Sequence, residues 1–243
     1  MEKSRKELPF VLVNMAMTAD GKIATANRRF SSFGSQRDKH HLYELRATAD
    51  AVMAGARTID LNRVTLGPGA VKYRRLRISR GLAQSNLRIV VSRSGSVNPD
   101  AELFKHKFSP IILLTTKRVS ARRLERLRPL VDEIRVCGEQ EINFYEALRW
   151  LRSKWNIRRL LCEGGGEVND ALFRARLVDE LHLTVCSLIF GGRNAPTIAD
   201  GTGAAFLRQA SRWKVQSARR QGKEMFFCFG RLRSESIRRL GCG

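Results

Sequence analysis

Residues 158–173, with the sequence RRLLCEGGGEVNDALF, constrain the fold of this chain more than any other stretch. The apolar run at 160–162 stops at Glu163 and three consecutive glycines, after which apolar residues recur at spacings of three and four. This order is typical of a strand, a tight turn and a helix. Glycines in such a turn let backbone N–H groups approach a phosphate at the helix N-terminus, where the helix dipole favours negative charge. The segment therefore predicts a site for a phosphorylated small molecule and favours a dinucleotide.

The rest of the chain alternates between strand-like and helix-like patterns, which predicts an α/β fold with a mainly parallel sheet flanked by helices. Two consecutive strand patterns, at 213–218 and 225–232, predict a terminal antiparallel pair and therefore a mixed sheet. Residues 61–86 are rich in Gly and Arg and are expected to be irregular. The other expected strands are 8–15, 50–54, 87–91, 111–115, 133–137 and 179–189, and the expected helices are 36–47, 120–128 and 144–155.

Composition narrows the class of protein. A hydrophobic content of 43% and a charged content of 28% are those of an ordinary globular protein. No run approaches the roughly 18 apolar residues of a membrane span, and no signal-peptide cleavage pattern follows the N-terminus. We expect a cytoplasmic protein with no membrane partner. A single domain is predicted over residues 8–232, between a basic N-terminal extension at 1–7 and a basic C-terminal tail at 233–243.

The net charge of +22 is large for a metabolic enzyme. A charge of this size attracts anions and promotes loose, salt-sensitive binding to nucleic acid. The basic residues are spread along the chain, with concentrations at 72–80, 118–128 and 231–239, and no nucleic-acid-binding motif accompanies them. We interpret them as solvated faces and loops and predict no specific nucleic-acid partner.

The five cysteines and four histidines show no CxxC pair and no zinc-ligand spacing. Most of the cysteines lie in apolar, strand-like runs, as buried reduced thiols do. The sequence therefore predicts no metal site.

Three other short patterns contain candidate site residues. Asp20 lies in an Asp-Gly turn, a pattern that solvated turns share with catalytic sites. Arg46, near a helix end, suits either anion binding or stabilisation of that end. Arg93, just beyond a strand, suits either a 2′-phosphate contact or a generic turn. The glycine segment matches neither a P-loop nor G-x-G-x-x-G, because Asn169 takes the last glycine position, so a purely structural turn is its alternative.

Taken in order, these patterns resemble the reductase domain of the bifunctional riboflavin-biosynthesis deaminase/reductase and its stand-alone relatives. The resemblance covers about residues 8–232, nearly the whole chain. Its landmarks are MTADGK at 17–22, LRA at 45–47, DAVMAGART at 50–58, LRIVVS at 87–92, EGGG at 163–166, LVDEL at 177–181 and IFGG at 189–192.

The resemblance implies a dihydrofolate-reductase-like fold, an NADPH cofactor and commonly a homodimer. It also implies reduction of the ribosylamino side chain of a pyrimidine 5′-phosphate, a phosphorylated substrate, to a ribitylamino chain. On the same basis Arg46 and Glu163 are expected to contact the substrate, and Glu163 and Asp20 are the candidates for catalysis. The residues expected to contact the cofactor are Ala16, Met17, Thr58, Asn62, Ser92, Arg93, Gly164, Gly165, Gly166, Glu167 and Val168.

The loop after Thr58 departs from the family pattern. Asn62 stands where the family has a cofactor-binding Asp, and Gly69 stands where it has a substrate-binding Arg. Nearby basic residues that are candidates for the missing charge are Lys72, Arg74 and Arg75. Two alternatives therefore stay open, namely a same-fold NADPH reductase for another substrate such as a pterin, and a nucleic-acid-binding protein on a reductase scaffold.

Overall fold

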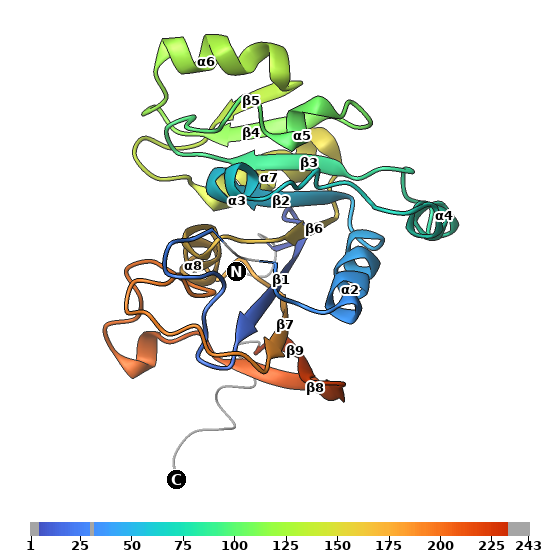
Figure 1. Ribbon diagram of the computed structural model, residues 1–243. Helices are drawn as coiled ribbons and strands as arrows, with labels where there is room; N and C mark the ends of the chain where they lie inside the picture. Colours follow the sequence, from blue (N-terminus) through green and yellow to red (C-terminus); the bar gives the residue numbers. More distant parts are fainter. Residues whose placement is uncertain (1–4, 30–31, 233–243) are drawn as a thin grey trace.

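The computed structural model describes residues 5–29 and 32–232 of the chain (Figure 1). These described residues contain one nine-stranded sheet of order β5-β4-β3-β2-β6-β1-β7-β9-β8. Neighbouring strands are parallel from β5 to β7, and β9 is antiparallel to both β7 and β8. The strands are β1 (Phe10–Thr18), β2 (Ala51–Gly55), β3 (Leu87–Val91), β4 (Ile111–Thr115), β5 (Glu133–Val136), β6 (Arg159–Cys162), β7 (Glu180–Cys186), β8 (Trp213–Gln221) and β9 (Glu224–Arg231).

The α/β class and the mixed, mainly parallel sheet are therefore confirmed, including the terminal antiparallel pair. The strands predicted at 87–91 and 111–115 are β3 and β4 residue for residue. The predicted tail at 233–243 and the first four residues of the predicted N-terminal extension lie outside the described residues. The domain boundaries stay a prediction.

Helices cover both faces of the sheet because successive strand residues alternate between two apolar clusters. Val11 and Val13 of β1 pack with α7 and α8 on one face, whereas Leu12 packs with α2, α3, α5 and α6 on the other. The helices are α2 (Gln36–Arg46), α3 (Ala56–Leu61), α4 (Val71–Ser79), α5 (Glu102–Lys105), α6 (Ala121–Leu127), α7 (Phe144–Trp155) and α8 (Gly166–Arg174), with short 3₁₀ turns at Arg128–Leu130 and Leu207–Gln209.

Local sequence signals explain where two of these helices start. The Ser120 hydroxyl accepts a hydrogen bond from the backbone N–H of Arg123 and caps α6, as its position before that helix predicts. Asn143 caps α7 in the same way, and the apolar residues Phe144, Leu148 and Leu151 then fall on the buried face.

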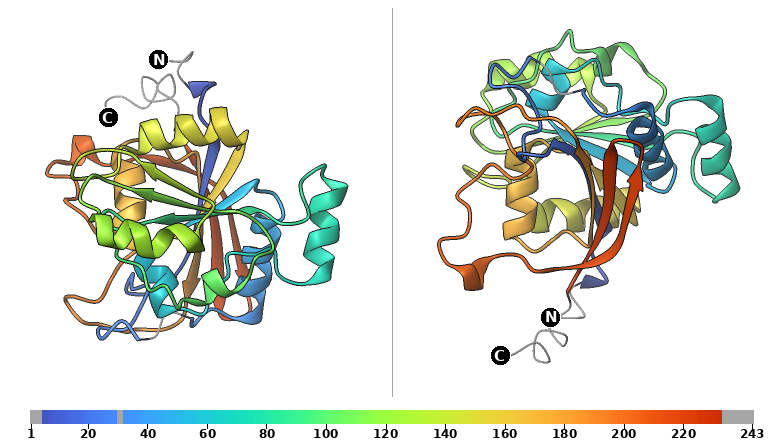
Figure 2. Two further views of the ribbon diagram at one scale, coloured as in Figure 1. Left: turned by 90° about the horizontal axis from the view of Figure 1, so that it is seen from above. Right: turned by 60° about the horizontal axis from the view of Figure 1, so that its bottom comes forward.

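Helix α4 contradicts the expectation that residues 61–86 are irregular. It stands away from the sheet in all views (Figures 1 and 2). The residues it buries are Tyr73 and Arg77, so its inner face lacks the apolar periodicity that identifies a helix in sequence. The Arg77 guanidinium donates to the carbonyl oxygens of Arg46 and Ala49, at 2.6 Å each, and these contacts anchor the helix.

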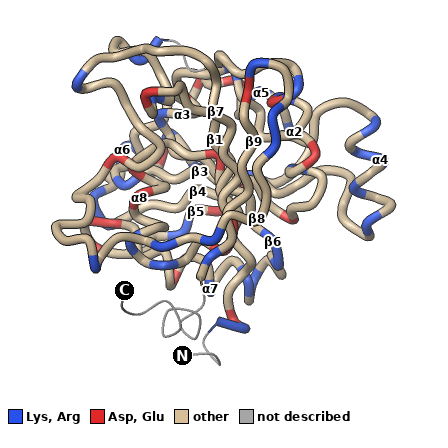
Figure 3. Tube along the Cα trace, turned by 90° about the horizontal axis from the view of Figure 1, so that it is seen from below, with Lys and Arg blue, Asp and Glu red and all other residues tan. Residues whose placement is uncertain are grey.

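The basic residues are distributed over many helices, strands and loops of the fold (Figure 3). Helix α4 is an example, because Lys72, Arg74 and Arg75 occupy it with no acidic residue in its first turn. Among the described residues, no helix has the length and apolar character needed to cross a membrane.

Candidate functional site

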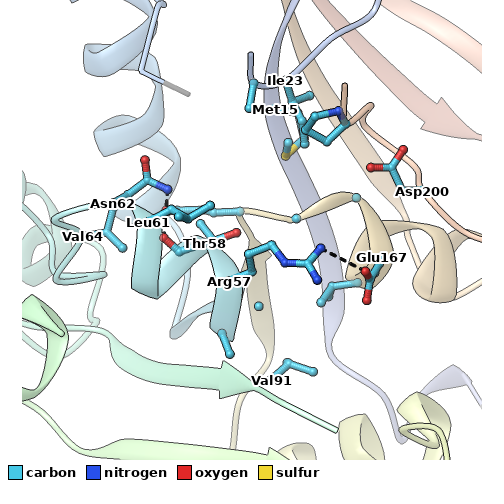
Figure 4. Close-up of a pocket in the computed structure, with 18 of the residues that line it drawn as sticks. Met15, Ile23, Arg57, Thr58, Leu61, Asn62, Val64, Val91, Glu167 and Asp200 are labelled. Carbon is cyan, nitrogen blue, oxygen red and sulfur yellow. Dashed lines mark hydrogen bonds and ion pairs between the residues drawn. The ribbon is translucent and has the colours of Figure 1, made fainter. Parts of the chain in front are cut away.

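A cleft of about 1630 Å³ opens where the carboxyl ends of the central strands meet. Its walls include Ala16 of β1, Gly55 at the end of β2 and Glu163 just after β6. Val91, at the end of β3, lines it as well (Figure 4). Ligands of open α/β sheets bind at this edge. The volume exceeds the roughly 300–1,000 Å³ of a typical single-ligand pocket, so the cleft has room for two ligands.

The glycine turn forms the floor of this cleft. Helix α8 begins at Gly166, and its N-cap residue Gly165 supplies no side-chain hydrogen bond. The first N–H groups of such a helix lack intrahelical partners and are free to bind an anion. A Cβ at Gly165 would meet only the Thr58 hydroxyl, at 3.5 Å, whereas a Cβ at Gly164, where φ is +83°, would lie 2.7 Å from the Met15 sulfur. Glycine is therefore required at 164, and Gly165 leaves the cleft floor open.

Glu163 and Arg46 form a buried ion pair at one end of the cleft. The Arg46 Nε and Nη2 atoms donate to the two Glu163 carboxylate oxygens at 2.6 Å each, and Nη1 donates to the Gly67 carbonyl at 2.7 Å. Burial by itself lowers the pKa of Arg46, but the charge and hydrogen bonds of Glu163 outweigh it, and the net shift is upward. All three guanidinium nitrogens of Arg46 are therefore engaged within the protein.

At the other end of the cleft Arg93 takes part in an exposed network. Its guanidinium contacts Glu141 at 2.6 Å and Glu167 at 3.2 Å, and Glu167 also pairs with Arg57 at 3.2 Å (Figure 4). Ser92 and Ser94, on either side of Arg93, line the same part of the cleft. Exposed pairs of this kind contribute little to stability, so a bound phosphate can replace the carboxylates around Arg93.

Asp20 fixes a loop rather than lining the cleft. Its carboxylate accepts hydrogen bonds from the Thr18 hydroxyl at 2.5 Å and from the backbone N–H groups of Phe190 and Gly191 at 3.2 and 2.7 Å. The Thr18 hydrogen bond is the largest cause of the lowered pKa of Asp20, and the two N–H groups add to it. The catalytic role predicted for Asp20 stays a prediction without a contact to the cleft.

Two polar residues of the cleft wall went unnoticed in the sequence. Asp38 lines the cleft from α2, and burial raises the pKa of its carboxyl, although a hydrogen bond from Thr184 acts in the opposite direction. Its Oδ1 atom and the Oδ1 atom of Asn14 are buried without a hydrogen-bond partner among the described residues. Neither residue belongs to a recognisable motif, so only their burial beside the cleft identifies them.

The structure brings most of the predicted site residues together. Met17, Gly164 and Asp20 are not among the residues that line the cleft, although Gly164 lies directly behind its floor, where its carbonyl accepts from the Gly55 N–H at 2.8 Å. Asn62 also caps the end of α3 through its side-chain N–H to the Thr58 carbonyl, at 2.9 Å. The predicted residues that line the cleft are Ala16, Arg46, Thr58, Asn62, Ser92, Arg93, Glu163, Gly165, Gly166, Glu167 and Val168.

The glycine at position 69 has a structural cause. A Cβ there would lie 2.6 Å from the ring of Tyr43, which stacks on Tyr73 with a centroid distance of 5.2 Å. An arginine at this position would displace that aromatic pair. The basic residues of α4 considered as replacements, Lys72, Arg74 and Arg75, do not line the cleft.

Other basic residues do reach the cleft from α2 and from the loop that follows α3. Lys39 and Arg63 line it, and neither pairs with a described carboxylate. They are thus positioned to bind an anionic group of a ligand.

Comparison with known proteins identifies the family. The family described as RibD C-terminal domain matches residues 9–227. The 2,5-diamino-6-ribosylamino-4(3H)-pyrimidinone 5′-phosphate reductase of Aquifex aeolicus is 28% identical over 223 residues, which cover 90% of this chain and 95% of that protein. The Archaeoglobus fulgidus protein of the same name is 29% identical over 208 residues, with coverages of 86% and 93%.

Solved structures confirm the fold. A pyrimidine reductase-like protein from Corynebacterium diphtheriae superposes with a TM-score of 0.78 at 20% identity, over 95% of both chains. The diaminohydroxyphosphoribosylaminopyrimidine deaminase/5-amino-6-(5-phosphoribosylamino)uracil reductase of Thermotoga maritima gives 0.70 at 19% identity, over 93% of this chain and 58% of that one. The dihydrofolate-reductase-like fold predicted from the sequence is therefore confirmed.

Proposed function

Because this chain belongs to the RibD C-terminal domain family, we propose that it reduces 2,5-diamino-6-ribosylamino-4(3H)-pyrimidinone 5′-phosphate with NADPH and produces the ribitylamino compound. The observation that carries the proposal is that relatives with this reductase name match along almost their whole length. The chain also has the buried Arg46–Glu163 pair at its cleft. The diamino substrate is favoured over its deaminated form because these relatives are named for the diamino compound.

The cleft floor fits a dinucleotide. The uncapped N-terminus of α8 and the open surface at Gly165 suit a pyrophosphate. The Thr58 and Ser92 hydroxyls and the Arg93 guanidinium line the same wall and would hold the ribose phosphates, with Arg93 selecting NADPH over NADH. When bound, the nicotinamide supplies the hydride. Ala16 and Met15 line the cleft beside the floor and would position its ring.

The opposite wall fits the pyrimidine phosphate. Arg46 holds the Glu163 carboxylate in one orientation, and that carboxylate then accepts hydrogen bonds from N–H or O–H groups of the substrate. Since all three guanidinium nitrogens of Arg46 already have partners, Arg46 acts through Glu163. The residues that would bind the substrate phosphate are then Lys39 and Arg63. The unpartnered Asn14 oxygen offers a further acceptor for the amino groups of the pyrimidine.

The reduction also needs a proton, and the structure offers a second carboxyl for this step. Asp38 lines the cleft with a pKa raised by burial, so it keeps its proton more readily than an ordinary aspartate. We therefore add Asp38 to Glu163 as a candidate proton donor. We prefer it to Asp20, because the lowered pKa of Asp20 keeps that carboxylate ionised.

A direct assay tests the proposed function. Purified protein is mixed with NADPH and the diamino pyrimidine phosphate, and NADPH absorbance and the ribitylamino product are followed together. Parallel reactions use the deaminated pyrimidine, a dihydropterin and NADH. The expected result is turnover of the diamino substrate that exceeds every parallel reaction. No NADPH binding and no pyrimidine turnover would refute the proposal, and turnover of the pterin alone would replace it.

The homodimer and the cytoplasmic location that the sequence predicts stay predictions.

A further inference from the structure

A cluster of possible metal ligands lies on strands β7 and β9 of the sheet, beside helix α2. Glu180, His182 and Cys228 each present one donor atom, and these atoms lie within 4.8 Å of one another. The Cys228 sulfur is 3.3 Å from a Glu180 carboxylate oxygen and 3.9 Å from the Nε2 atom of His182, and that nitrogen is 3.5 Å from the other Glu180 oxygen. The Cys228 sulfur, the His182 nitrogen and the Glu180 carboxylate, whose two oxygens each contact one of the other donors, thus form a compact triangle.

Strand pairing creates this triangle. His182 of β7 lies directly opposite Cys228 of the antiparallel strand β9. Glu180 precedes His182 by two residues and therefore projects from the same face of β7. His182 and Cys228 are 46 positions apart in the sequence, so the spacing rules that predict no metal site do not detect the cluster.

The distances in the triangle suit a tetrahedral zinc ion. Zinc bonds of roughly 2.0–2.3 Å to oxygen, nitrogen and sulfur separate tetrahedral ligand atoms by about 3.3–3.7 Å. The Cys228 sulfur and the His182 nitrogen are 3.9 Å apart, and each lies 3.3 or 3.5 Å from a different oxygen of the Glu180 carboxylate, so the cluster is close to the size that a tetrahedral ion requires. Imidazole, thiolate and carboxylate are also the ligand types that zinc prefers, whereas a thiolate disfavours magnesium and calcium.

Two further side chains complete the surroundings of the triangle. Gln216 occupies the irregularity in β8 between Val215 and Ser217, and its Oε1 atom lies 3.1 Å from the Cys228 sulfur. Bulges re-aim side chains in this way. On the opposite side, the Nδ1 atom of His182 lies 3.2 Å from the Nε2 atom of His41 on α2. A partner on the second ring nitrogen is the arrangement that fixes metal-binding histidines.

We propose that Glu180, His182 and Cys228 form a zinc-binding site, with the Gln216 oxygen or a water molecule as the fourth ligand. Binding removes the proton of the Cys228 thiol to solvent, because the thiolate is the ligand. Arg159, whose Nη2 atom is 3.4 Å from a Glu180 oxygen, competes with the metal for this carboxylate. The bound ion would connect β7 to β9 and, through His41, to α2, which carries the Lys39 and Arg46 side chains of the cleft.

A second cysteine in the same pair of strands provides the matched control. The Cys186 sulfur lies 3.5 Å from a Glu224 oxygen, which reproduces the thiol–carboxylate contact without a histidine. If the Cys228 cluster is only a hydrogen-bonded group, Cys186→Ser and Cys228→Ser should have equal effects on metal binding. If the Cys228 cluster is a zinc site, only Cys228→Ser should abolish zinc binding.

The experiment measures metal binding by the whole 243-residue chain. Metal-free protein is titrated with ZnCl₂ against a chromophoric chelator, and a second sample is titrated with CoCl₂ and followed by absorption spectroscopy. The expected result is one zinc per chain and, with cobalt, a sulfur-to-metal charge-transfer band together with the visible bands of a tetrahedral ion. Cys228→Ser should remove the sulfur-to-metal band. Either Cys228→Ser or His182→Ala should weaken zinc binding about 100-fold or more. The control Cys186→Ser should keep both the band and the zinc affinity.

His41→Gln extends the test to the outer contact and is expected to weaken zinc binding about 10-fold, the size of loss typical of such partners. Far-ultraviolet circular dichroism of each variant without metal separates a lost ligand from a lost fold. The proposal is overturned by substoichiometric zinc binding to the unmodified protein, by cobalt spectra without a sulfur band, or by binding that persists in the folded Cys228→Ser variant. None of these readouts depends on turnover, so failure here is distinguishable from failure of the proposed reductase activity.

Discussion

Two arginine–glutamate pairs at opposite ends of the cleft share a contact distance of 2.6 Å but differ in exposure. The side chains of Arg46 and Glu163 are 5% and 10% exposed, whereas those of Arg93 and Glu141 are 43% and 69% exposed. In the buried pair each charge depends on the other, because neither has water as a substitute. In the exposed pair solvent replaces either partner at small cost. The burial of an ion pair, rather than its contact distance, therefore decides whether its partners are fixed or can be replaced.

The difference matches the roles proposed for the two ends. The substrate end needs a carboxylate held in one orientation, and the buried pair provides it. The proposed cofactor end needs a cation that can change partners, because in the proposal the 2′-phosphate of NADPH replaces the carboxylates around Arg93.

The largest effect is expected for Arg46→Met, which leaves the Glu163 carboxylate buried without a cation. Removal of one partner from a buried pair costs about 3–5 kcal/mol of the free energy of unfolding. Urea denaturation measures it, with Arg93→Met as the control, for which a loss below about 1 kcal/mol is expected. Equal losses in the two variants would show that burial does not distinguish the pairs.

Glu163→Gln should lower kcat/KM for the pyrimidine phosphate about 10–100-fold, because hydrogen bonds to a charged group contribute roughly 1.5–3 kcal/mol. The Kd for NADPH should stay within about twofold of that of the unmodified protein, since the change lies at the substrate end. Steady-state kinetics and a fluorescence titration measure the two quantities. A comparable loss of NADPH affinity would contradict the assignment of Glu163 to the substrate.

Arg93→Ala should raise the KM for NADPH about 3–10-fold, the effect of roughly 1 kcal/mol at an exposed charged contact. The KM for NADH should change little, because NADH lacks the 2′-phosphate. Glu141→Gln is the matched control and should leave the KM for NADPH unchanged or lower it, because it frees Arg93. If both cofactors respond equally to Arg93→Ala, Arg93 does not select NADPH.

The smallest effect concerns Asp38, a half-buried carboxylate of the cleft that has no arginine partner among the described residues. Burial raises its pKa above the ordinary 3.8, so the folded protein holds this proton at pH values where the unfolded chain has lost it. Folding stability then falls as pH rises through the interval between the two pKa values. Asp38→Asn should therefore gain stability relative to the unmodified protein above that interval, and the gain should shrink toward pH 3.8. Thermal unfolding across pH measures it, and a pH-independent difference would contradict the burial of this charge.

The sequence predicted most of the fold because strands and most helices leave local periodic signals. β3, β4 and α7 begin and end at the predicted residues. Helix α4 was missed because one of the two residues that it buries is Arg77, which is anchored by carbonyl groups more than 25 positions away. A pattern search that relies on apolar spacing does not register a helix held in place by a buried arginine.

By itself, the sequence determined the glycine turn at 163–166, the strand before it and the helix after it. These depend on neighbouring residues, namely an apolar run, residues without Cβ atoms and an amphipathic repeat. Tertiary structure alone decided which charges remain free. It joined Arg46 to Glu163 and filled the space at Gly69 with the Tyr43 ring. It also brought Lys39 and Arg63 to the cleft. On the sheet, it placed Glu180 and His182 beside Cys228. The physical reason is that hydrogen bonds, ion pairs and desolvation depend on distances between segments far apart in the chain, and these distances exist only after the sheet has formed.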